Sequence, residues 1–167
     1  TSHGLAHLVT AHGFQELESL SLQSNAIESL SHTTHHRFAR FSRLRALSLA
    51  ANQLRAENVR YLLEDDIIPQ LTSLDLSYTE LQNAGAELVA ACERFDSLRH
   101  LDLGMNRLGH SGIRALANAP WIARLDTLML GGNDLRLDAI VELCESPYLP
   151  PKLKEAWRSQ QRQLDGA

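Results

Sequence analysis

Histidines are the residues of this chain whose type and spacing most directly suggest chemistry. Six of the eight lie within the first 36 residues, at His3, His7, His12, His32, His35 and His36. The last three would share one face if their segment is helical, and neutral imidazole is a ligand of zinc and copper. No cysteine lies nearby. A metal site on His32, His35 and His36 is one hypothesis; an irregular helix, or a surface covered by another part of the protein, is the other.

A serine flanked by glycines is the second group that could do chemistry. Gly109-His110-Ser111-Gly112 is one spacer residue short of the G-x-S-x-G elbow that presents a nucleophilic serine. The chain also contains no phosphate-binding loop, no H-E-x-x-H and no dinucleotide fingerprint. We therefore expect no catalysis by this chain and no cofactor.

The elements that position these residues follow from an internal repeat. The pattern L-x-x-L-x-L occurs five times at a constant interval of 27 residues. The copies are Leu17-Leu20-Leu22, Leu44-Leu47-Leu49, Leu71-Leu74-Leu76, Leu98-Leu101-Leu103 and Leu125-Leu128-Leu130. Four continue to an asparagine three residues later (Asn25, Asn52, Asn106 and Asn133), where the third has Thr79. Such a period predicts a solenoid, whose units bury their apolar faces by stacking.

Each unit divides into an expected strand and an expected helix. In the first unit, Leu20 and Leu22 point to one side of a short strand and Ser21 to the other, because side chains alternate along a strand. In the fourth unit, Ile113 and Leu116 have helical spacing. The 25th position of every unit is apolar and should anchor the return to the next strand: Phe41, Ile68, Phe95, Ile122 and Leu149.

These residues resemble the leucine-rich repeat family, from Leu17 to about Pro151. The 27-residue period and the glycine at unit position 15 resemble the ribonuclease-inhibitor-like subclass. The amino-acid sequence that begins at Gly112 resembles the leucine-rich repeats of bacterial proteins. The resemblance implies an α/β fold, a solenoid with a concave parallel β-sheet and convex helices. It also implies a ladder in which each asparagine side chain bonds the backbone of its turn. Thr79 should weaken that ladder, because a hydroxyl replaces the amide.

Three segments make up the expected organisation. Residues 1–16 form a helical half-unit with Phe14 at the anchor position, and this is either a truncated repeat of a longer protein or a natural N-terminal cap. Residues 17–151 form the five repeats of 27 residues. Residues 152–167 form a C-terminal capping helix and tail, with Trp157 against the last repeat.

Composition narrows the class of partner and the compartment. Hydrophobic residues make up 44% of the chain, but no run approaches the roughly 18 apolar residues of a membrane span. A net charge of −4 speaks against nucleic acid, which requires a basic surface. The two cysteines, Cys92 and Cys144, lie two repeats apart and are expected to be free thiols. This favours the cytoplasm or another reducing compartment, although a secreted effector stays open.

The remaining candidate site is the outward face of the expected sheet. Its last three strands carry Asp75, Tyr78, His100, Asp102, Met105 and Met129. Parallel strands lie about 4.8 Å apart, so Asp75 and Asp102 should be neighbours of like charge, which is unfavourable without a cation or basic group between them. Tyrosine and methionine are enriched in interface cores. The alternative is that these are ordinary residues of a solvated sheet face.

The repeat and this face together predict a function. We expect a non-catalytic protein–protein interaction module that binds a protein partner on its concave face. One alternative is the substrate-recognition segment of a larger enzyme or effector. A second alternative is a metal-binding activity built on the N-terminal histidines.

Overall fold

A computed structural model describes residues 2–10, 13–30 and 38–165. Its five strands are β1 (Ser19–Ser21), β2 (Ala46–Ser48), β3 (Ser73–Asp75), β4 (His100–Asp102) and β5 (Thr127–Met129). Its α-helices are α1 (Ser2–Thr10), α2 (Arg55–Leu63), α3 (Gln82–Ala90), α4 (His110–Ala117), α5 (Leu137–Glu145) and α6 (Pro151–Asp165). Short 3-10 helices are η1 (Phe38–Arg40), η2 (Ile68–Gln70) and η3 (Pro120–Arg124).

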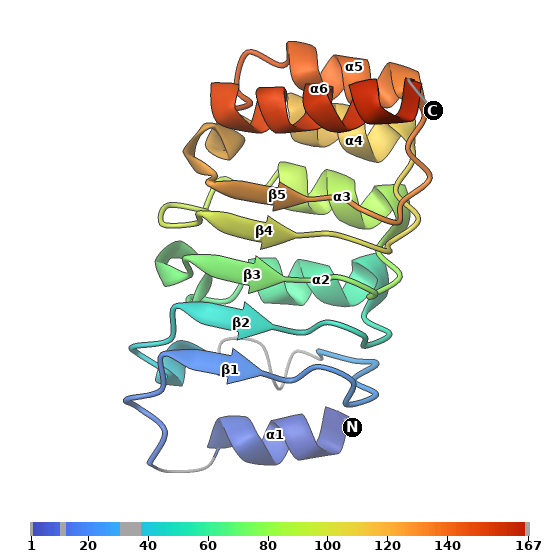
Figure 1. Ribbon diagram of the computed structural model, residues 1–167. Helices are drawn as coiled ribbons and strands as arrows, with labels where there is room; N and C mark the ends of the chain where they lie inside the picture. The colour runs from blue at the N-terminus through green and yellow to red at the C-terminus, as the bar shows by residue number, and fades with distance from the viewer. Residues whose placement is uncertain (1, 11–12, 31–37, 166–167) are drawn as a thin grey trace.

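The strands form one parallel sheet in sequence order, β1-β2-β3-β4-β5, and α2 to α5 lie on one side of it (Figure 1). Every pairing joins residues 27 apart, as in Leu47↔Leu74 and Leu74↔Leu101. The constant register follows from the constant period, because each unit places the same residue at the same height of the sheet. The expected α/β solenoid is confirmed.

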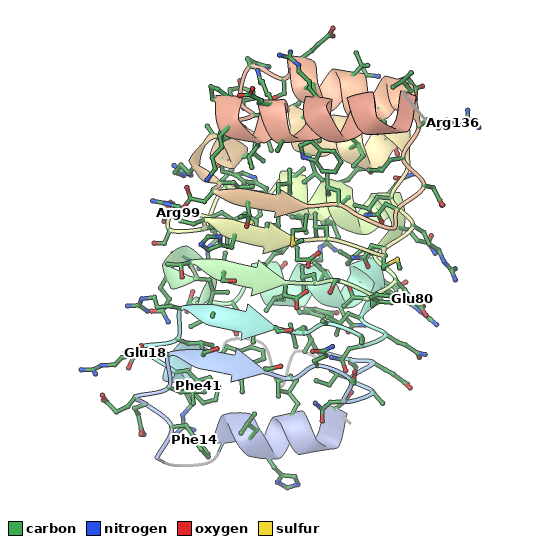
Figure 2. All side chains as sticks on the ribbon, in the orientation of Figure 1. Phe14, Glu18, Phe41, Glu80, Arg99 and Arg136 are labelled. Atoms are coloured by element: carbon green, nitrogen blue, oxygen red, sulfur yellow. The ribbon has the colours of Figure 1, made fainter. Side chains whose placement is uncertain are left out.

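The core is the layer between the sheet and the helices. The leucines of the pattern fill it, with Leu44, Leu74 and Leu101 no more than 1% exposed. The five anchor side chains at unit position 25 are likewise buried. Phe14, at the same position before the first strand, is instead 40% exposed (Figure 2). In this structure Phe14 is therefore not a buried anchor like the other five.

Asparagine side chains hold the turns that follow the strands. The Asn52 amide nitrogen donates to the carbonyl oxygens of Leu22 and Leu49, both at 2.9 Å. Its Oδ1 accepts the backbone N–H groups of Asn25 (3.1 Å) and Ile27 (2.9 Å). Asn106 and Asn133 accept two N–H groups of the preceding unit in the same way: those of Thr79, Leu81, Asn106 and Leu108. Asn52, Asn106 and Asn133 therefore each join two units, whereas Asn25 is exposed and donates to the Gln23 carbonyl of its own turn at 3.0 Å.

Thr79 interrupts this ladder. Its hydroxyl donates to the Leu76 carbonyl at 2.6 Å and lies 3.1 Å from Asn106 Oδ1. Among the residues that the structure describes, it accepts no N–H group from Asn52 or Leu54, the two donors that an asparagine would serve. The expected weakening of the ladder is thus a loss of two bonds between the second and third units.

The turn after each strand contains a residue in the left-handed backbone region, at the eighth position counted from the first leucine of the unit. These residues, with φ between 52° and 69°, are Ser24, Ala51, Tyr78, Met105 and Gly132. This conformation costs an L-residue about 1–2 kcal/mol. It turns the chain so that the following asparagine faces inward, and Tyr78 and Met105 are left exposed.

The C-terminal helix α6 packs against α5 at the end of the stack (Figure 1). Leu153 is 8% exposed and belongs to the core, and Trp157 is half-buried against it. Within the described ranges, no helix combines the length and apolar character needed to cross a membrane.

Replacing Leu101 tests which face of the sheet is the core. Leu101 is 1% exposed, so Leu101→Ala should lower the free energy of unfolding by about 2–5 kcal/mol. Ser73→Ala, on the opposite face of the sheet, should change it by less than about 0.5 kcal/mol. Urea denaturation measures both values. Similar losses at the two positions would contradict the alternation described here.

Candidate protein-binding face

The open face of the sheet carries the six residues singled out in the sequence, hereafter the sheet-face patch: Asp75, Tyr78, His100, Asp102, Met105 and Met129. Tyr78, Met105 and Met129 are 56%, 45% and 58% exposed. The strand register pairs Asp75 with Asp102. The patch therefore combines large apolar side chains in water with two neighbouring carboxylates.

Asp75 is tied into the sheet by hydrogen bonds. Its Oδ2 accepts the hydroxyl of Ser48 at 2.8 Å. Its Oδ1 accepts the backbone N–H of Ser77 at 3.0 Å and the hydroxyl of Ser77 at 2.7 Å. These bonds close the turn after β3, so Asp75 has a structural role whether or not a partner contacts it.

Asp102 is less fully bonded. Its Oδ1 accepts the Gly104 N–H at 2.8 Å, and Oδ2 accepts no bond from any residue in the described part of the chain. Partial burial raises the pKa of Asp102, the Gly104 hydrogen bond opposes this, and the negative charge of Asp75 adds to the rise. The carboxylate of Asp102 is therefore the more available of the two for a cationic group.

Met105 extends the patch towards the last strand. A Cβ atom on Gly132 would lie 1.9 Å from the Met105 sulfur and 2.9 Å from its Cγ. The Met105 side chain thus rests directly on the Gly132 backbone, which only glycine permits. His100 adds a polar link between β4 and β5, since its Nδ1 lies 3.0 Å from the Thr127 hydroxyl.

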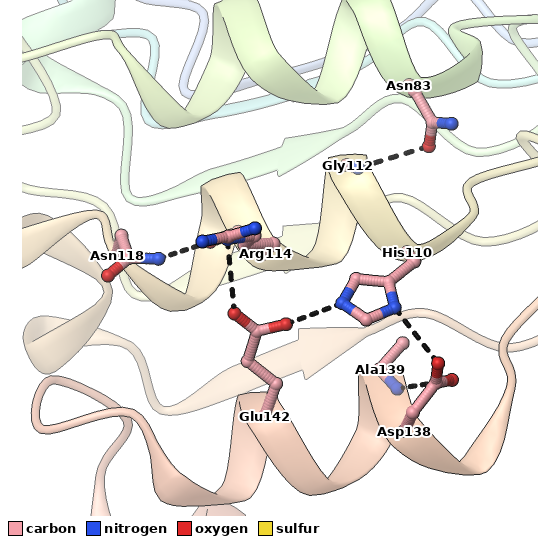
Figure 3. Close-up of polar contacts among 8 residues, drawn as sticks. All are labelled: Asn83, His110, Gly112, Arg114, Asn118, Asp138, Ala139 and Glu142. Atoms are coloured by element: carbon pink, nitrogen blue, oxygen red, sulfur yellow. Dashed lines mark hydrogen bonds and ion pairs between the residues drawn. The ribbon is translucent and has the colours of Figure 1, made fainter.

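A second polar cluster lies on the helical side of the sheet, between α4 and α5 (Figure 3). His110 Nδ1 is 3.1 Å from Asp138 Oδ2, and its Nε2 is 2.7 Å from Glu142 Oε2. Arg114 reaches the other Glu142 oxygen at 3.4 Å. The carboxylates of Glu142 and Asp138 raise the pKa of His110. Both ring nitrogens are engaged by carboxylates, so the cluster joins two helices and leaves no nitrogen to activate Ser111.

The histidine hypothesis falls largely outside the structure. His32, His35 and His36 lie outside the described residues, and so does His12. Among the residues that are described, no group of three or more histidines, cysteines or acidic residues could hold a metal ion.

Comparison with known families concerns the repeats that carry this patch. Residues 69–90 and 97–117 match the family model described as Leucine Rich repeat. These segments are leucine-rich repeats. The two matches contain β3 and β4 with their turns and helices, and hence Asp75, Tyr78, Asp102 and Met105. Leucine-rich repeats generally mediate protein–protein interaction. No curated protein matches the chain.

Two features of the repeats escaped the sequence analysis. The first is the His110 cluster, in which His110 contacts Asp138 and Glu142, 28 and 32 residues later in the chain. These separations are one and five residues longer than the 27-residue repeat, and nothing else in the sequence indicated the contacts. The second is an apolar groove beside β5, lined in part by Leu128, Trp157 and Ala156. It depends on how α6 packs on the last repeat, and the repeat pattern carries no information about that.

Asp102→Asn tests the like-charge pair. The pKa of Asp102 is raised above its ordinary value of 3.8, so the folded protein favours the protonated carboxyl group. The resulting contribution to stability is fully present below pH 3.8 and is lost as the pH rises through the folded pKa. Asparagine keeps an oxygen for the Gly104 N–H. The variant should be equally or more stable at pH 7, with the difference vanishing near pH 3. A loss above about 1 kcal/mol at pH 7 in urea denaturation would instead assign the carboxylate a structural role.

His110→Gln tests the polar cluster between α4 and α5. Because carboxylate bonds raise the pKa of His110, the contribution of its cation is fully present below pH 6.5 and is lost as the pH rises through the raised pKa. The wild type should therefore exceed the variant in melting temperature at pH 6, by a margin that narrows at alkaline pH. In a background of Asp138→Asn and Glu142→Gln, His110→Gln should have no pH-dependent effect. A margin independent of pH would contradict the ionic contact.

Proposed function

We propose that this chain is a non-catalytic protein-interaction module that binds its partner on the concave sheet face, at the sheet-face patch. The observation that carries this proposal is the exposure of Tyr78, Met105 and Met129 on three consecutive repeats. Large apolar side chains exposed together on one face are a common mark of a recognition surface. The first two strands present mainly serine and alanine on the same face, such as Ser21 and Ala46.

Side-chain size separates this patch from the rest of the sheet edge. Backbone strain alone does not mark it, because Ser24 and Ala51 adopt the same left-handed conformation as Tyr78 and Met105. A small side chain suffices for the turn. A tyrosine and a methionine at this position add exposed apolar area that the turn does not require.

Charge suggests what the partner presents. Asp102 offers a half-buried carboxylate with one oxygen unbonded in the described structure, next to the charge of Asp75. A lysine or arginine of the partner would relieve this repulsion and gain a charge-assisted hydrogen bond. An apolar partner side chain would cover Tyr78 and Met105. We therefore expect a partner surface with a basic group flanked by apolar residues.

The wider context of the module follows from its binding face, its repeat length and its cysteines. The chain fits the substrate-recognition segment of a larger enzyme or effector equally well, because both uses need the same binding face. The 27-residue unit supports membership of the ribonuclease-inhibitor-like subclass, and the sequence after Gly112 supports a bacterial origin. Cys92 and Cys144 are buried and unbridged, which supports a reducing compartment such as the cytoplasm.

Tyr78 gives the sharpest test, because replacing it with glycine should weaken partner binding and yet stabilise the free protein relative to the alanine variant. Tyr78→Ala should weaken partner binding by about 2 kcal/mol, as expected for a buried aromatic anchor. Tyr78→Gly should weaken binding similarly while raising the stability of the free protein by about 1 kcal/mol over Tyr78→Ala, since glycine tolerates the left-handed backbone. Isothermal titration and urea denaturation measure the two quantities.

Ser24→Ala is the matched control, because Ser24 has the same unit position and conformation in the first repeat. A pull-down with the wild type and these variants as baits first identifies the partner. A protein retained by the wild type and Ser24→Ala but lost by Tyr78→Ala supports the proposal. A partner whose affinity ignores both Tyr78→Ala and Asp102→Asn would move the site to another surface.

A further inference from the structure

The backbone at the end of every internal strand is completed by the next strand. The residue at unit position 6 donates its N–H to the following unit, as Leu76 does to the Asp102 carbonyl at 2.9 Å. Position 8 does the same, as in Tyr78 to the Gly104 carbonyl at 3.0 Å. The carbonyl at position 2 accepts two consecutive N–H groups, as that of Thr72 does. These bonds recur at all four strand junctions.

The fifth unit presents the same groups with no strand to receive them. The N–H groups of Leu130, Gly132 and Asn133 donate to no acceptor within residues 2–10, 13–30 and 38–165. Over the same ranges, the Asp126 carbonyl accepts no hydrogen bond. The unpaired edge of β5 is therefore a template for one more parallel strand, in a register that the other four junctions define. Asp126 and Gly132 are exposed at this edge, whereas Leu130 is 1% exposed.

An apolar groove runs along this edge. It has a volume of about 630 Å³ and lies between β5, with the turn that follows it, and the helix α6. Apolar side chains in its wall include Leu135, Ile140, Leu153 and Trp157. An extended chain bonded to the β5 edge would place alternate side chains into this groove. α6 thus covers the last repeat without completing its sheet.

The groove is continuous with the sheet-face patch. Met129 and Gly132 line the groove, and the Met105 side chain lies on Gly132. Apolar surface therefore extends from Met105 across the last repeat into the groove. A single protein partner can contact both surfaces.

We propose that the groove between β5 and α6 binds an extended segment of the protein partner, which adds to the sheet as a sixth parallel strand. Its carbonyl groups accept the N–H groups of Leu130 and Gly132, and two of its own N–H groups donate to the Asp126 carbonyl. Its alternate side chains are apolar and fill the groove. This inference rests on the proposed function, since the partner is the one that contacts the sheet-face patch.

A synthetic peptide of residues 98–106 is a suitable probe, because this segment makes the same bonds to β3 within the protein. The peptide should bind the full chain in solution and slow the amide hydrogen exchange of Leu130 and Gly132 about ten-fold at saturation. A peptide N-methylated at the positions of Arg99 and His100 keeps every side chain but lacks both donors to Asp126. It should not slow the exchange.

Replacing each of two exposed alanines with lysine tests where the peptide binds. Ala156 is exposed and lines the groove, so Ala156→Lys should weaken peptide binding about ten-fold by placing a charge among apolar walls. Ala123→Lys makes the same change at an exposed position of η3 outside the groove and should leave binding unchanged. Tyr78→Ala should also leave peptide binding unchanged, which separates the groove from the sheet-face patch.

Three results would overturn the proposal. Peptide binding insensitive to N-methylation would show that no strand is added. If the peptide does not bind while partner binding stays sensitive to Tyr78→Ala, the groove is not a binding site, and the proposed function of the sheet-face patch is unaffected. A dimer in sedimentation that Ala156→Lys dissociates, without peptide binding, would assign the groove to a second copy of the chain.

Discussion

Each of the first four units of this chain has backbone donors just after its strand that bond the next unit. Two of them, as in Leu103 and Met105, bond carbonyl groups of the following strand, and further donors bond the following asparagine. An unpaired buried N–H group costs about 1–3 kcal/mol. A unit is therefore stable only in the stack, and the 27-residue register, the parallel order and the position of the helices follow from this requirement.

The same requirement determines which side chains are free to bind a partner. Alternate strand positions point into the core, and the asparagine position is used by the ladder. What remains is the open sheet face and the left-handed residue at the end of each strand. Tyr78 and Met105 occupy that left-handed position, and Met129 lies on the open face. The proposed binding face thus consists largely of side chains that the fold does not need, with Asp75 as the exception because it bonds Ser48 and Ser77.

The periodic features could be predicted from the sequence, and the features that depend on particular rotamers could not. A constant interval fixes the register, which is why Asp75 and Asp102 could be expected as neighbours. The bonds from Ser48 and Ser77 to Asp75 depend on side-chain rotamers, and they give this aspartate a structural role that its position did not reveal. The contacts of His110 depend on the rotation of one helix against the next. The exposure of Phe14 could not be predicted either, because the repeat pattern gives its position in the unit and not what packs against it.

The hydrogen-bond ladder is incomplete at two places, and only one of them adjoins a groove that a partner could enter. Thr79 lacks the amide oxygen of an asparagine, so the N–H groups of Asn52 and Leu54 lose the acceptor that an asparagine would provide. Both residues are buried, at 2% and 0% exposure, because the third unit packs on the second. No chain can approach them. At β5 no strand follows, and the groove beside α6 is lined by Gly132, which is exposed, and by Leu130, which is only 1% exposed. An incomplete ladder inside the stack lowers stability, whereas the same incompleteness at its end creates an edge to which another strand can bind.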